Sequence, residues 1–138
     1  MNEYAGRTEA NQFNLGELER KLGLEILECT LKQVVGRIPV ESNRQPWGRL
    51  HGGACLALGE TLGSLAASLH AAAQGLQAVG VDVNATHHAA ANSGWVTGTA
   101  SPLHLGRRLT THQVVIEDQT GRRISTLRIT NLLIEPEP

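Results

Sequence analysis

Residues 52–69 are apolar or small on every side of a predicted helix, and Glu60 is their only charged side chain. A carboxylate buried without a partner is costly, and proteins keep one chiefly where it performs a task. Ser64 would lie one turn beyond Glu60 on the same helical face, with Gly59 and Gly63 leaving room for a close approach. Two interpretations follow: Glu60 is a functional carboxylate, or one stripe of this helix reaches solvent and carries it.

The loop before this segment offers donors to a developing negative charge. It ends in the pair Gly52 and Gly53, which would open the helix. The N–H groups of a first helical turn have no internal partner and lie at the positive end of the dipole. These amides could therefore stabilise a carbonyl oxygen that gains charge. The alternative is that the two glycines only make a tight turn and that the preceding His51 is a structural histidine.

Hydrophobic spacing predicts the elements at the start of the chain. A short helix is predicted over residues 15–22, with Asn14 as its N-cap and Gly23 as its stop. Near-alternation of apolar and polar residues then predicts one or two strands over residues 24–40, with breaks at Gly36 and Pro39. These elements precede the turn-rich loop.

The remaining elements are one long helix and four strands. The helix is predicted over residues 53–73 and is expected to be buried all round, because it is apolar all round. Period-two patterns predict strands near residues 79–83, 95–100, 110–117 and 123–134. Turn residues at 92–94 and 118–121 predict hairpins. No crossover helix separates these strands, so the fold class is α+β, with a mostly antiparallel sheet curved around one long helix.

Composition limits the classes of partner. The chain has 138 residues and a formal net charge of -1, too little positive charge to favour nucleic acid. No apolar run reaches the roughly 18 residues of a membrane span. The presence of only 2 cysteines fits a reducing cytoplasm. We expect residues 1–14 to form a flexible segment and residues 15–138 a single domain. With 3% aromatic residues, this domain is expected to depend on contacts with a partner subunit for part of its stability.

Three motifs carry a resemblance to a known family. Residues 45–64, QPWGRLHGGACLALGETLGS, resemble the signature of hotdog-fold acyl-CoA thioesterases of the 4-hydroxybenzoyl-CoA type. Residues 84–88 (NATHH) and 102–106 (PLHLG) resemble the subgroup that contains the 1,4-dihydroxy-2-naphthoyl-CoA thioesterases and the enterobactin proofreading thioesterases. The likeness runs from about residue 23 to residue 134. It implies the hotdog fold, in which the sheet wraps one long central helix.

The resemblance implies catalytic roles for five residues. Glu60 corresponds to the catalytic carboxylate, as a nucleophile or as a general base towards water. The Gly52 N–H corresponds to the donor that polarises the thioester carbonyl. Ser64 corresponds to a hydroxyl that helps, across a dimer interface, to place the water or the carboxylate. Gln45 and His51 correspond to polar neighbours of the carbonyl and the carboxylate, with His51 as an orienting hydrogen-bond partner.

Further candidate substrate-binding residues are Trp47, Gly53, Thr61, His87, His88, His104, Leu105, Gly106 and Arg107. The resemblance places His87, His88, His104 and Gly106 near the acyl group and CoA, whereas Trp47 could line an acyl pocket or serve as a packing anchor. Arg107 is one of several arginines that could meet the phosphates of CoA. Ala89 stands where close relatives carry an arginine, so the nucleotide contact is expected to be weaker or to come from another arginine. His87 and His88 are adjacent on a strand and point to opposite faces, so no shared metal ion is expected.

The activity implied is hydrolysis of an acyl-CoA thioester to the free acid and CoA. The acyl group would be aromatic, such as hydroxybenzoyl or the 1,4-dihydroxy-2-naphthoyl group of menaquinone synthesis. No cofactor is expected, because CoA is part of the substrate. Sites of this family lie between subunits, which implies a homodimer or a dimer of dimers. The alternatives are proofreading of aryl thioesters on a carrier protein, a non-catalytic acyl-CoA binding module, and a hydratase on the same fold.

Overall fold

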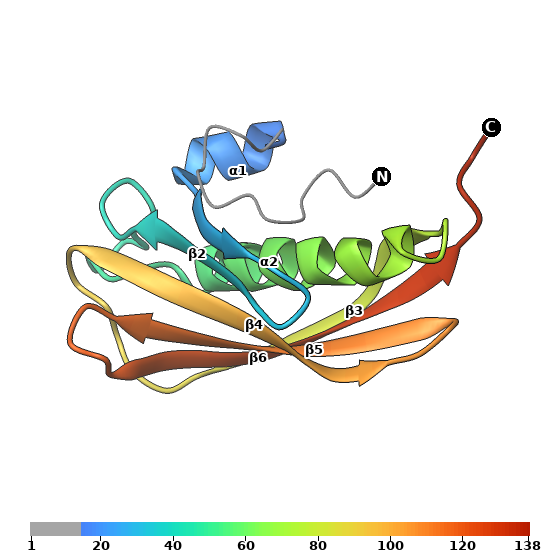
Figure 1. Cartoon of the computed structure of the whole chain (residues 1–138). Coiled ribbons are helices and arrows are strands. Elements are labelled where there is room, and N and C mark those ends of the chain that lie inside the picture. Colours follow the sequence, from blue (N-terminus) through green and yellow to red (C-terminus); the bar gives the residue numbers. More distant parts are fainter. Residues whose placement is uncertain (1–14) are drawn as a thin grey trace.

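The computed structural model describes residues 15–138; the segment 1–14, expected to be flexible, lies outside the described residues. One six-stranded sheet curves around the long helix α2, and the short helix α1 lies on the side of α2 away from the sheet (Figure 1). The elements in chain order are α1 (Glu17–Leu22), β1 (Glu25–Cys29), β2 (Val34–Pro39), α2 (Gly52–Ala72), β3 (Gln77–His87), β4 (Trp95–Leu105), β5 (Leu109–Asp118) and β6 (Arg123–Ile134). This architecture confirms the predicted α+β hotdog fold.

The first elements follow local signals, with one exception. α1 ends at Gly23, whose φ of 73° is a left-handed conformation that favours glycine. The N-cap is Gly16, while the predicted cap Asn14 lies outside the described residues. The break predicted at Gly36 is wrong, because Gly36 lies inside β2. There the missing side chain makes room for α2: a Cβ would stand 2.7 Å from Leu62 Cδ2.

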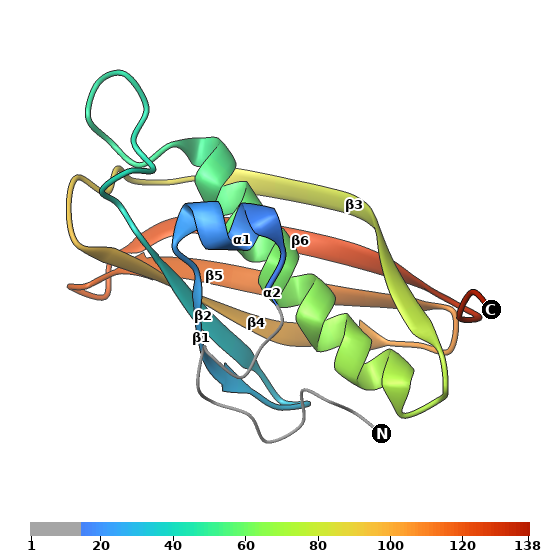
Figure 2. The same ribbon diagram turned by 90° about the horizontal axis from the view of Figure 1, so that it is seen from above.

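The sheet has the strand order β1-β2-β4-β5-β6-β3, and every neighbouring pair is antiparallel. Residues 118–121 form the predicted hairpin between β5 and β6. The hairpin predicted at residues 92–94 is wrong, because β3 pairs with β6 and not with β4. The chain instead passes from β3 across the sheet to β4, which leaves β3 at one edge (Figure 2).

Glycines allow α2 to lie close to the sheet. A Cβ at Gly59 would stand 2.5 Å from Leu127 Cδ2 of β6, and a Cβ at Gly63 would overlap Ile129 of the same strand. Because these two glycines have no side chain, side chains of β6 pack directly against the backbone of α2. The expectation that they leave room for a close approach beside Glu60 is corrected, because both face β6.

The expectation that α2 is buried all round is also wrong. The buried residues of α2 are Ala54, Cys55, Leu58, Gly59, Leu62, Gly63, Ala66, Ala67, Leu69 and Ala71. Gly53 and Glu60 are exposed, because the sheet covers one side of the helix and α1 covers only part of the other. No helix within residues 15–138 has the length and apolar character needed to cross a membrane.

Among residues 15–138, four polar side chains lie in the interior, namely Thr110, His112, Ser125 and Asn131. Thr110 Oγ1, His112 Nδ1 and Asn131 Oδ1 have no hydrogen-bond partner in the described part of the chain. Burial, with a smaller contribution from the charge of His70, lowers the pKa of His112 to about 4. The folded chain therefore keeps this ring neutral well below the ordinary histidine range.

Replacing Gly63 by alanine should destabilise the fold, although alanine favours a helix over glycine by about 1 kcal/mol. The added methyl group would overlap Ile129. Overpacking of this kind costs about 1–3 kcal/mol, so after the gain in helix propensity the free energy of unfolding in urea should fall by about 1 kcal/mol, and by about 2 kcal/mol at most. Ser68→Ala, at a half-buried position of the same helix, is the control. Equal stability of the two variants would contradict the close packing.

Stability should also fall as the pH drops from 6.5 towards 4. The pKa of His112 is about 4 in the folded chain against 6.5 for an unperturbed histidine. Between these values the unfolded state binds the additional proton, so acid favours unfolding, by roughly 3 kcal/mol at most. Urea unfolding at several pH values measures the loss. The His112→Leu variant should lose less stability over this interval, and an equal loss in both proteins would overturn the assignment.

Candidate active site

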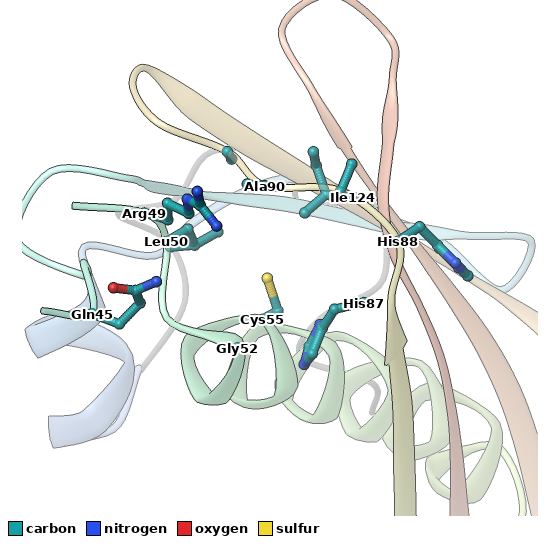
Figure 3. A pocket seen from close by; sticks show the side chains of 11 residues that line it. Gln45, Arg49, Leu50, Gly52, Cys55, His87, His88, Ala90 and Ile124 are labelled. Carbon is teal, nitrogen blue, oxygen red and sulfur yellow. The ribbon is translucent and has the colours of Figure 1, made fainter. Parts of the chain in front are cut away.

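The loop of residues 41–50 contains a tight turn that fixes the side chain of Gln45. The Gly48 N–H donates to the Gln45 carbonyl at 3.0 Å, and Gly48 has a φ of 83°. The Trp47 N–H donates to Gln45 Oε1. Because the turn holds this oxygen, the amide nitrogen is the end of the side chain that faces the start of α2 (Figure 3).

His51 is the N-cap of α2. Its Nδ1 accepts a hydrogen bond from the Gly53 N–H at 2.8 Å, and its carbonyl accepts one from the Ala54 N–H at 3.0 Å. Within the described residues, the Gly52 N–H is therefore left as the unpaired amide of this first turn. An unpaired N–H at the positive end of a 21-residue helix is a donor for an oxygen that gains negative charge.

The ring of His87, at the end of β3, lies against Gly52. A Cβ at Gly52 would stand 2.7 Å from His87 Nε2. On its other side the ring is anchored, because His87 Nδ1 is 2.7 Å from Ser125 Oγ. Ser125 also hydrogen-bonds the Cys55 thiol; burial raises the pKa of this thiol, and the bond to Ser125 lowers it by less. Sequence reasoning missed Ser125, since nothing in its own strand marks it as an anchor.

Of these groups, Gln45, Gly52, Cys55 and His87 line one cleft of about 340 Å³ at the N-terminal end of α2. Its polar side chains are Gln45, Arg49, His87 and His88 (Figure 3). The rest of the wall is backbone or apolar and consists of Leu50, Gly52, Cys55, Ala89, Ala90, Ala91 and Ile124. A few converging donors on a mostly apolar wall are typical of a site for a small ligand.

Glu60 and Ser64 lie further along α2. Glu60 is exposed, so in the single chain it lies on the part of α2 that faces solvent, as the second interpretation of the sequence stated. Its Oε1 lies over Gly80 of β3, 3.2 Å from the point that a Cβ would occupy, and Ser64 Oγ is 3.9 Å from the same point. Glu60 follows Gly52 by about 12 Å along the helix axis. The carboxylate and the free amide are therefore too far apart to act on one carbonyl within one chain.

Two other predicted residues, Trp47 and Thr61, lie outside the first cleft, whereas His88 is part of its lining. Trp47 is 84% exposed and does not line the cleft. Thr61 Oγ1 donates to a glutamate of α1 at 3.2 Å and so faces that helix. His88 is the residue after the end of β3; its Nε2 is 2.9 Å from Thr126 Oγ1, and its ring points away from that of His87 (Figure 3).

A second cleft, of about 570 Å³, lies at the turn between β4 and β5. It is lined by His104, Gly106, Arg107, Arg108 and Leu109. The adjoining Leu105 is 42% exposed. The cleft lies at the C-terminal end of α2, where His70 Nε2 is 2.7 Å from the Gly106 carbonyl. The length of α2, about 30 Å, therefore separates the two clefts.

Metal ligands are not grouped in this structure. Among residues 15–138, no group of three or more His, Cys, Asp or Glu side chains lies close enough to hold a metal ion. What the site offers is hydrogen-bond donors, a carboxylate and arginines.

Comparisons with known proteins agree with this geometry. The family model described as "Thioesterase superfamily" matches residues 48–125. The chain is 41% identical over 122 residues to the proofreading thioesterase EntH of Cronobacter sakazakii, covering 88% of this chain and 83% of that protein. A solved thioesterase from Haemophilus influenzae is 32% identical with a TM-score of 0.85, covering 96% of this chain and 95% of that chain. A mutant thioesterase from Pseudomonas aeruginosa is 28% identical with a TM-score of 0.86, covering 96% and 98%. The chain thus belongs to the thioesterase superfamily and is a thioester hydrolase with the hotdog fold.

Proposed function

We propose that this thioesterase hydrolyses acyl-CoA thioesters and binds the thioester carbonyl oxygen at the start of α2. The unpaired Gly52 N–H carries the proposal, because the rest of the first turn is occupied by the His51 cap. The amide nitrogen of Gln45 faces the same cleft and supplies a second donor. Preorganised donors stabilise the negatively charged oxygen of a tetrahedral intermediate more strongly than the uncharged carbonyl oxygen of the substrate.

Glu60 supplies the carboxylate of the proposed reaction. In one route it takes a proton from water while the water oxygen attacks the carbonyl carbon. In the other its own oxygen attacks that carbon, and water then opens the resulting anhydride. In both routes the C–S bond breaks, the sulfur of CoA leaves and receives a proton, and the free acid remains.

A second copy of the chain would complete the site. β3 is a free edge of the sheet, and its residues 80–82 are exposed. Two β3 strands that pair around a two-fold axis run antiparallel, and so do the two α2 helices. Gly52 of one chain then approaches Glu60 of the partner subunit. Leu103 and Leu132, 58% and 39% exposed, would suit the pairing of two such dimers.

The acyl group that we propose is aromatic, because the wall of the first cleft is largely apolar and would take a flat ring. Arg107 and Arg108 in the second cleft are the cations proposed for the CoA phosphates. The likeness to a proofreading thioesterase supports a second substrate form, an aryl thioester on a carrier protein. Cys29 and Cys55 are free thiols, which suits the cytoplasm that we propose as the compartment.

Replacing Glu60 by glutamine should lower kcat by roughly 10²- to 10⁴-fold, because the amide can neither accept the proton nor attack the carbonyl. Release of free thiol from benzoyl-CoA and from a benzoyl carrier protein measures the effect and compares the two substrate forms. Glu117→Gln, at an exposed position of β5, is the matched control. Normal turnover by Glu60→Gln would rule out the proposed role.

Mixing two weakened variants should restore activity if the site spans two chains. Gln45→Ala removes a donor from the cleft, and Glu60→Gln removes the carboxylate. Chains unfolded together and refolded as an equal mixture should regain about one quarter of normal activity, because half the dimers are mixed and each has one intact site of two. Each variant refolded alone is the control. A mixture no more active than these controls would place the whole site in one chain.

A further inference from the structure

Asn131 occupies an interior position of β6 where alternation calls for an apolar side chain. Leu127, Ile129 and Leu133 are buried at the alternate positions around it. Asn131 is 0% exposed, its Nδ2 donates to Ser64 Oγ at 3.2 Å, and its Oδ1 has no hydrogen-bond partner among the described residues. Burying an amide with one end unpaired is costly. A leucine at this position would avoid that cost, so packing alone does not account for the asparagine.

The Asn131 amide lies beside the proposed catalytic carboxylate. In the register of β3 with β6, Asn131 is opposite Gly80. From the point that a Cβ of Gly80 would occupy, Glu60 Oε1 is 3.2 Å away, and Ser64 Oγ and Asn131 Nδ2 are each 3.9 Å away. Polar atoms from α2 and from the sheet therefore converge over a residue that has no side chain.

We propose that Asn131 is a positioning residue for Ser64 and, through Ser64, for Glu60; this inference rests on the hydrolytic role proposed for Glu60. A serine hydroxyl has one hydrogen to donate and accepts through its oxygen. Because Asn131 donates to Ser64 Oγ, the hydroxyl hydrogen is available to another acceptor. The Glu60 carboxylate shares the space over Gly80 with Ser64 Oγ, and in the proposed arrangement it accepts that hydrogen. The resulting chain of hydrogen bonds fixes the orientation in which the carboxylate meets the substrate.

The free space over Gly80 is part of this arrangement. A Cβ at Gly80 would stand 3.2 Å from Glu60 Oε1, a distance at which the carboxylate has to shift. The glycine thus leaves the position of Glu60 to be set by Ser64 and Asn131. This explains how an exposed glutamate can keep one orientation at the edge of the sheet.

Asn131→Leu tests the proposal. The variant should lower kcat about tenfold and leave KM within about twofold, because a misoriented carboxylate slows the chemical step while the contacts that bind the substrate remain. Its free energy of unfolding should not fall, since the unpaired Oδ1 is removed as well. Asn131→Ala is a second variant in case leucine does not fit at this position. It removes the same donor without adding bulk and should give the same fall in kcat.

The matched control is Thr110→Val. Thr110 lies opposite Asn131 in the register of β5 with β6, is equally buried, and has an unpaired Oγ1 of its own. Valine has the same shape without the hydroxyl. This variant should keep normal kcat and KM, because Thr110 makes no bond to Ser64. If Asn131→Leu and Asn131→Ala are as active as Thr110→Val, the proposal is wrong.

A double-mutant cycle separates positioning from a general effect on structure. In the Ser64→Ala background, Asn131→Leu should have no further effect on kcat, because the proposed effect passes through the Ser64 hydroxyl. An additive loss would overturn the proposal. Glu60→Gln, measured in parallel, distinguishes the two failures: normal turnover of that variant refutes the hydrolytic role itself, whereas its inactivity with active Asn131 variants refutes only the positioning role.

Discussion

The close contact between α2 and the sheet is the constraint on which the rest of the structure depends. It is made from both sides, since glycines of the helix receive side chains of β6 and glycines of the sheet receive a leucine of the helix. The two methyl groups of Leu62 stand 2.7 Å and 2.8 Å from the Cβ positions of Gly36 and Gly98, which are partners across β2 and β4. Because interiors are close-packed, this fit fixes both the height and the rotation of α2. The cap, the free amide and the carboxylate all belong to this helix, so their places follow from it.

A rigid helix also explains why the chemistry is distributed along the molecule. The donors lie at one end of α2, the carboxylate near its middle, and the arginine-lined cleft at its far end. Loop movement within one chain cannot shorten the distance between the Gly52 amide and Glu60, because both belong to the same helix. Antiparallel pairing with a second chain is the simplest geometry that brings opposite ends together.

The elements of the fold were predictable because their signals are local. The spacing of apolar residues marks α2 and the strands, and the motif at residues 45–64 is contiguous, so its donors had to meet at the start of α2. Strand partners are not local: the turn residues at 92–94 indicate a turn without showing that β3 pairs with β6. The exposure of Glu60 likewise depends on how much of the helix the sheet covers. Asn131 was overlooked, although an asparagine within the alternation of β6 was a visible signal.

The loop that holds Gln45 also carries Trp47, a fluorescent side chain. The chain contains 2 tryptophans, and they lie in contrasting surroundings. Trp47 is 84% exposed at the loop, whereas Trp95 is half-buried with the Arg37 guanidinium 4.0 Å from the centre of its ring. Anything that covers the loop, whether a bound acyl chain or a neighbouring subunit, changes the solvent around one indole and leaves the other as an internal reference. The fluorescence of the unmodified protein can therefore report occupancy of the loop separately from the integrity of the fold.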